Sequence, residues 1–185
     1  MLLLRGPRVL VEPLTEDDVA AVTAYRRSPD VARWQSWDVD YDEADARRLV
    51  AGRPAGDLPG PGEWLQLAVR STDRAVLHGD VGVHRLAAQP RTFELGVTLA
   101  PAAQGHGLAT EALRCVLAYL FADADAHRVV ACCDARNAPV AALLRRVGMR
   151  HESRQVEADW FKGEWTTLAG YAILARELGP AQLRR

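Results

Sequence analysis

Two neighbouring segments decide the expected fold: Phe93-Glu94-Leu95-Gly96-Val97-Thr98-Leu99, and shortly after it Gln104-Gly105-His106-Gly107-Leu108-Ala109. The first is apolar and partly β-branched, which is typical of a strand. From Leu108 to Phe121, apolar residues recur at helical spacing. A strand, a glycine turn and a helix N-terminus together favour anion binding, because the first helical amides lack partners within the helix and glycines allow close approach. We interpret the segment as a pyrophosphate cradle.

The glycine motif alone is weak, because short Gly-x-Gly runs also mark ordinary turns. A P-loop would place Lys and then Ser or Thr after its second glycine, where this chain has Leu108 and Ala109. A dinucleotide-binding fold would carry the glycines in its first strand–helix unit. In this chain the glycines lie in the second half of the sequence, after strands whose pattern is typical of antiparallel hairpins. Neither common nucleotide fingerprint fits.

Composition indicates an ordinary globular protein. The 185 residues fit one domain, expected over residues 1–185, with 49% hydrophobic and 25% charged residues. With 23 basic and 24 acidic residues the formal net charge is −1, so nothing points to a nucleic-acid partner. No apolar run approaches the roughly 20 residues of a membrane span. The apolar stretch at the start of the sequence is too short for a signal peptide. We expect no membrane association.

The cysteines show no metal-ligand spacing. Cys115, Cys132 and Cys133 suggest a reduced, cytoplasmic compartment, and the five histidines are scattered, so we expect no metal site. Cys132 and Cys133 are neighbours in a predicted strand and should point to opposite faces. We expect buried, structural cysteines.

The order of predicted elements implies an α/β (α+β) fold on one mixed sheet. Strands are expected over residues 8–14, 64–70, 76–86, 91–99 and 128–133, helices over 15–27, 41–52, 108–121 and 139–147, and a hairpin over 151–160 and 164–175. The connection Arg33-Trp34-Gln35-Ser36-Trp37 separates the first two helices.

With these elements in order, the chain resembles the GCN5-related N-acetyltransferases, the GNAT superfamily, and within it the branch that acetylates the N-termini of ribosomal proteins. Residues 104–109 match the Gln/Arg-x-x-Gly-x-Gly/Ala motif of that family. The other matching features are Thr110-Glu111-Ala112, Asn137, Val147-Gly148-Met149 and Lys162-Gly163-Glu164-Trp165. The resemblance covers nearly the whole chain. It implies a twisted, mostly antiparallel sheet of about seven strands with about four helices and splayed central parallel strands.

The resemblance also implies direct acetyl transfer from acetyl-CoA to a primary amine, without a covalent enzyme intermediate. The amides of the glycine loop would hold the pyrophosphate of the cofactor, and an amide at Val97 or Leu99 would polarise the acetyl oxygen. Asn137 would contact the pantetheine arm or order a water, or it would simply cap a helix. The expected cofactor-binding residues are Val97, Leu99, Gln104, Gly105, His106, Gly107, Leu108, Ala109, Thr110 and Asn137.

Glu94 is the candidate base, because an ammonium group must lose a proton before it can attack. It occupies a polar position in an otherwise apolar strand, about where the family often places a glutamate. The alternative is a structural carboxylate that forms a local ion pair, for instance with Arg91. Trp34 and Trp37 would border the acceptor cleft as aromatic walls. We expect one of these two tryptophans to be core packing instead.

The chain departs from the family pattern at the proton donor for the leaving thiolate. Val140 and Leu144 stand where serine or tyrosine is common, so the general acid is unassigned, with Tyr25, Tyr41 and Cys132 as the remaining candidates.

The acceptor could be a protein N-terminus or a small-molecule amine. The alternative function is a non-catalytic acyl-CoA-binding sensor or interaction module. Monomer and homodimer both stay open.

Overall fold

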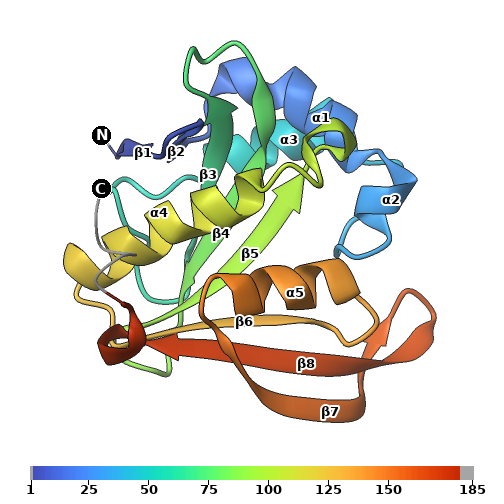
Figure 1. The fold of residues 1–185 in the computed structure, drawn as a ribbon. Coiled ribbons are helices and arrows are strands. Elements are labelled where there is room, and N and C mark those ends of the chain that lie inside the picture. The colour runs from blue at the N-terminus through green and yellow to red at the C-terminus, as the bar shows by residue number, and fades with distance from the viewer. Residues whose placement is uncertain (1, 180–185) are drawn as a thin grey trace.

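One eight-stranded sheet organises the computed structural model, which describes residues 2–179 (Figure 1). The strands are β1 (Leu4–Arg5), β2 (Val9–Pro13), β3 (Trp64–Ser71), β4 (Leu77–Arg85), β5 (Thr92–Leu99), β6 (Arg128–Asp134), β7 (Arg150–Phe161) and β8 (Glu164–Leu174). Their order across the sheet is β1-β2-β3-β4-β5-β6-β8-β7. Only β5 and β6 pair in parallel. The mixed, mostly antiparallel α/β fold is confirmed.

Helices lie on both faces of this sheet. They are α1 (Val19–Arg26), α2 (Pro29–Ala32), α3 (Glu43–Ala51), α4 (Leu108–Ala122) and α5 (Ala138–Arg146), with short 3₁₀ turns at Glu16–Asp18, Pro101–Ala103 and Ala175–Glu177. The expectation of about seven strands and four helices missed β1 and α2. Both are too short for a periodic pattern to reveal them.

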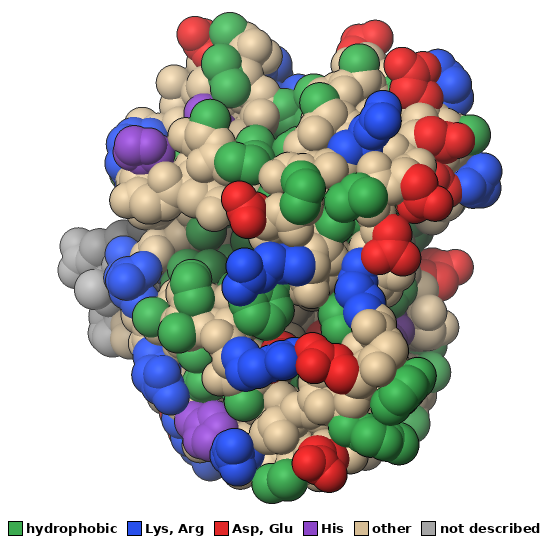
Figure 2. Space-filling model, turned by 90° about the vertical axis from the view of Figure 1, so that its right-hand side faces the viewer, with side chains coloured by type: hydrophobic (Ala, Val, Ile, Leu, Met, Phe, Trp, Pro, Cys, Tyr) green, Lys and Arg blue, Asp and Glu red, His purple; other side chains and the backbone are tan. Residues whose placement is uncertain are grey.

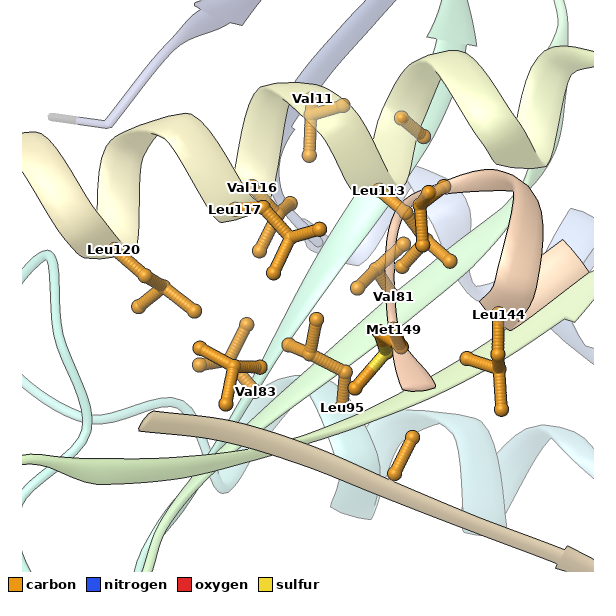
Figure 3. Packing of buried hydrophobic residues seen from close by; sticks show 14 of the residues in the cluster. Val11, Val81, Val83, Leu95, Leu113, Val116, Leu117, Leu120, Leu144 and Met149 are labelled. Carbon is orange, nitrogen blue, oxygen red and sulfur yellow. The ribbon is translucent and has the colours of Figure 1, made fainter. Parts of the chain in front are cut away.

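Helix α4 covers one face of the sheet and forms the main core (Figures 1 and 3). Its apolar side chains at helical spacing point toward alternate residues of β4 and β5 (Figure 3). The residues that meet here are Leu113, Val116, Leu117, Leu120, Val81, Val83 and Leu95, all 5% exposed or less. Because side chains alternate along a strand, the intervening residues of β4 and β5 belong to the opposite face.

On that opposite face, α1 and α3 cover part of the sheet and enclose a second, smaller core. An ion pair lies inside it: Nη2 of Arg26, on α1, is 3.2 Å from both carboxylate oxygens of Asp80, on β4. The two side chains are 5% and 3% exposed. The Tyr25 hydroxyl also donates to Asp80, and burial raises the pKa of Tyr25 well above its usual value. This network fixes α1 to the sheet.

Replacing Asp80 with Ala should destabilise the protein by about 3–5 kcal/mol, because the Arg26 charge would stay buried without its partner. Urea unfolding followed by circular dichroism measures this loss. The control is Glu43→Ala, which removes an exposed ion pair to Arg47 on α3 and should cost less than about 1 kcal/mol. Equal effects of the two variants would show that the buried pair does not fix α1.

Candidate functional site

The parallel strands β5 and β6 separate part-way along their length. They pair only over Thr92–Glu94 and Arg128–Val130. Beyond Glu94, β5 continues its pairing with β4, and β6 continues its pairing with β8. The two strands therefore enclose a wedge-shaped opening whose apex is Glu94, and the splayed central strands are confirmed.

Backbone groups of β5 face this opening. The amide of Ala100 donates to the carbonyl of His78 at 2.9 Å, and the carbonyl of Thr92 accepts from Leu86 at 3.0 Å. In an antiparallel pair, hydrogen-bonded residues alternate with residues whose backbone groups point away from the partner. With the continuous β4–β5 register, the even-numbered residues of β5 bond to β4. The amides of Val97 and Leu99 are thus directed toward the missing β6 neighbour.

The glycine loop supplies further unpaired amides. Gly105 and Gly107 have φ angles of +80° and +78°, which disfavour any residue with a Cβ atom. A Cβ at Gly105 would meet nothing within 4 Å, so the space above the loop is open. Among residues 2–179, the amides of residues 105–110 donate to no acceptor. They lie at the N-terminus of α4, where the helix dipole favours an anion.

Contacts from distant segments hold the loop in this shape. The Gln104 side chain donates to the carbonyl of Leu99 at 3.1 Å. Arg8 donates to the carbonyl of His106 at 3.0 Å and pairs with Glu111, on α4, at 2.9 Å. Glu111 also accepts from the amide of Val9 at 3.1 Å, which ties β2 to α4. Sequence reasoning missed Arg8, because its partners are far away in the chain.

A cavity of about 400 Å³ joins the loop to the opening between the strands. Its lining includes Val97, Leu99, Gln104, Gly105, Gly107, Ala109, Thr110 and Asn137, all of which were predicted, together with Thr98, Gln35 and Arg146, which were not. A second depression of about 950 Å³ lies over α4 and shares Gly105, Gly107, Thr110 and Arg146 with the first. Arg5, Arg8 and Arg114 border it, so the surface beside the loop is rich in positive charge.

Some predicted residues lie outside the cavity. The Leu108 side chain is 8% exposed and packs in the main core, and His106 is exposed. Trp34 does line the cavity, but Trp37 does not. The Arg26 guanidinium lies 4.0 Å from the centre of the Trp37 ring, and the indole N–H donates to the Arg26 carbonyl at 3.1 Å. Of the two tryptophans, Trp37 is therefore the one used for packing.

Glu94 is partly exposed and bonded to a histidine. Its Oε2 lies 3.2 Å from Nδ1 of His84, and its side chain is 32% exposed. The local pair with Arg91 does not form, because Arg91 bonds to Asp125 at 2.7 Å.

Side chains of both charges occur on the side of the molecule shown in Figure 2, with many of the acidic ones at the upper right, so charge of neither sign dominates this side. Within residues 2–179 no helix is long and apolar enough to cross a membrane. The same part of the chain contains no cluster of three or more His, Cys, Asp or Glu side chains that could hold a metal ion.

Comparison with known proteins identifies the fold and the family. Residues 8–150 match the model of the acetyltransferase (GNAT) domain. The chain belongs to the GNAT acetyltransferase family. It is an N-acetyltransferase, as are its named relatives: the uncharacterized N-acetyltransferase YnaD of Bacillus subtilis is 28% identical over 170 residues, which is 92% of this chain and 95% of the relative.

Many solved structures share the fold, among them two that contain CoA. RimJ of Mycobacterium smegmatis, in complex with CoA-disulfide, superimposes with a TM-score of 0.83 at 24% identity, covering 98% of this chain and 90% of that one. Spermidine N-acetyltransferase of Vibrio cholerae, in complex with CoA and spermine, gives a TM-score of 0.79 at 16% identity, covering 92% and 97%. Both neighbours bind CoA in the same fold.

The candidate proton donors lie in different parts of the structure. Tyr25 and Tyr41 are buried in the second core, and burial raises the pKa of both phenols. Val140 lines the cavity and Leu144 packs in the main core. Cys132 is exposed, contrary to the expectation of a buried cysteine, because β6 has lost its β5 neighbour at this point and pairs with β8 alone.

Cys132 also lies close enough to Glu94 for their charges to interact. Partial burial raises the pKa of the Cys132 thiol, and the negative charge of Glu94 raises it further. The thiol therefore keeps its proton at neutral pH. Cys115 and Cys133 are half-buried, and Cys133 packs against the main core from the other face of β6.

Asn137 combines two possible roles, and variants can separate them. Its Oδ1 accepts from the amide of Val140 at 3.3 Å, which caps α5, while the residue lines the cavity and is 7% exposed. Asn137→Ala should cost about 1 kcal/mol of stability and raise KM for acetyl-CoA. Asn137→Ser should restore the cap without the amide donor. Thermal unfolding and steady-state kinetics measure the two effects, and a normal KM in both variants would leave Asn137 a cap only.

Proposed function

We propose that this chain transfers the acetyl group of acetyl-CoA to a primary amine within a ternary complex. The observation that carries the proposal is the continuity between the glycine loop and the opening beyond Glu94. Unpaired amides line both, and one cavity connects them. An extended arm that carries amide groups and ends in a pyrophosphate fits such a combination.

The residues fit acetyl-CoA at each end. The amides of residues 105–110 and the α4 dipole would bind the pyrophosphate, and the arginines beside the loop would add positive charge. The pantetheine arm would lie along β5 as an added strand does, accepting hydrogen bonds from Val97 and Leu99. One of these amides would then stabilise the negative charge that develops on the acetyl oxygen.

Proton transfer is assigned to Glu94, at the apex of the opening. Its carboxylate would accept a proton from the acceptor ammonium, directly or through one water. The neutral amine then attacks the thioester carbonyl and the C–N bond forms. The C–S bond breaks, the CoA thiolate leaves, and this thiolate takes up the second proton that the nitrogen loses. A thiol with a pKa of about 8–9 is a good enough leaving group to need no strong acid. This accounts for activity with Val140 and Leu144 at the positions of the usual donors.

The acceptor is a protein N-terminus or a small amine. The spermidine N-acetyltransferase among the structural neighbours holds spermine, a small polyamine. The second candidate function is an acyl-CoA-binding module without turnover. The absence of a proton-donating side chain at Val140 and Leu144 favours this alternative.

A thiol-release assay with acetyl-CoA and a panel of amines tests the proposal. The panel contains spermidine, short peptides with free N-termini and simple monoamines. We expect CoA release with at least one acceptor, and we expect Glu94→Gln to lower kcat about 100-fold with little change in KM for acetyl-CoA. Glu43→Gln on α3 is the matched control and should leave kcat unchanged.

Thermal unfolding in the presence of acetyl-CoA separates the two candidate functions. A higher midpoint without CoA release from any amine would support the binding module. If millimolar acetyl-CoA caused no shift in the midpoint and no CoA were released, both candidate functions would be contradicted. Full kcat in Glu94→Gln would remove Glu94 as the base while leaving the transferase intact.

A further inference from the structure

Three side chains form a row across the sheet on the face opposite α4. Trp64 of β3 lies opposite His84 of β4, and His84 lies opposite Glu94 of β5. The neighbouring Val83 and Leu95 pack in the core under α4, so the row belongs to the other face. Glu94 is its inner end, at the apex of the opening.

The row is held by two direct contacts. The Trp64 and His84 rings are stacked, with centroids 4.6 Å apart and an interplanar angle of 10°. Nδ1 of His84 lies 3.2 Å from Oε2 of Glu94. Each side chain therefore limits the orientation of the next, from the indole to the carboxylate.

Two glycines leave room for the indole on this face. A Cβ atom at Gly82 would lie 3.0 Å from Cζ3 of Trp64 and 3.1 Å from Nε2 of Gln66, closer than such contacts normally are. The same Cζ3 atom is 4.0 Å from the corresponding position at Gly96. The indole thus lies across Gly82 on β4 and reaches toward β5, and it is still 42% exposed.

We infer that Trp64 and His84 position the carboxylate of Glu94, and that the exposed indole and the free oxygen of Glu94 form the subsite for the acceptor ammonium. The inference deepens the proposed function and rests on it. Trp64 and His84 are positioning residues, whereas Glu94 touches the acceptor. The acceptor then approaches from the face opposite α4.

The hydrogen bond determines where the protons are. An ionised carboxylate can only accept, so the bond requires a proton on Nδ1 of His84. Among residues 2–179, Oε1 of Glu94 has no hydrogen-bond partner, which leaves it available to an ammonium N–H. The exposed indole and the carboxylate belong to the same face of the sheet, and an aromatic ring and a carboxylate both attract a cation. The amine can therefore bind in its charged form and lose its proton to Glu94 in place.

Nitrogen NMR of the histidine side chains tests the positioning contact without any acceptor. In protein with ¹⁵N-labelled histidine, the two neutral tautomers give different ¹⁵N shifts, and His84→Phe identifies the His84 signals among the five histidines. We expect neutral His84 in the Nδ1–H form. A predominantly Nε2–H ring would overturn the inference, because it cannot donate to Glu94.

Kinetics with acetyl-CoA and the panel amine that releases CoA fastest test the catalytic consequence. His84→Phe keeps an aromatic ring for stacking but loses the donor, and should lower kcat about tenfold or more without changing KM for acetyl-CoA. His84→Asn places an amide N–H near the position of Nδ1 and should restore most of the loss. Trp64→Leu should raise KM for the amine. His78→Phe, on the same strand, is the control.

The failures are distinguishable. If Glu94→Gln is impaired but His84→Phe has normal kcat, the positioning role is wrong and the proposed function stands. If His84→Asn is as impaired as His84→Phe, the ring rather than the donor matters, which also overturns the inference. If no amine is turned over, the NMR result still decides whether His84 donates to Glu94. Each variant should unfold at the same midpoint as the unsubstituted protein, which shows that a lower kcat does not result from a loss of folding.

Discussion

The separation of β5 from β6 after Glu94 is the constraint on which the rest of the site depends. In a continuous sheet, β6 would take up the backbone groups of Val97 and Leu99, and nothing would be left for a ligand. The separation is stable because each strand keeps its other neighbour, β4 for β5 and β8 for β6. Each half of the sheet also has its own helix: α5 contacts β6 and β7, whereas α4 contacts β2 and β4 (Figure 1).

This division assigns different chemistry to different places. The glycine loop and the odd-numbered amides of β5 form a surface suited to the phosphate and amide groups of the proposed cofactor. The even-numbered side chains of β5 lie on the opposite face, where Glu94 is bonded to His84. The two surfaces meet at the opening between β5 and β6, where Thr98 lines the same cavity as the glycine loop. On the proposed mechanism the thioester and the amine come together there, with the buried Arg26–Asp80 pair holding α1 beside the same face.

The features that could be predicted from the sequence are the local ones. The glycine loop, the helix after it, the strand before it and the cap at Asn137 all depend on residues close together in the chain, and the structure contains each of them. The pairs Arg8–Glu111 and His84–Glu94 depend on the register of strands and on packing between distant segments, which periodicity does not specify. The exposure of Cys132 was missed for a related reason. Alternation predicts its face, but only the separation of the strands uncovers it.

Hydrogen exchange with and without acetyl-CoA tests the central claim most directly. The account predicts that saturating acetyl-CoA slows exchange at the amides of Val97, Leu99 and residues 105–110, which have no acceptor in the described chain. The amide of Thr98, directed toward β4, should be slow in both states. If acetyl-CoA slowed exchange at Thr98 but not at Val97 and Leu99, a cofactor site between the separated strands would be contradicted. Slowing confined to the β7–β8 hairpin would contradict it as well.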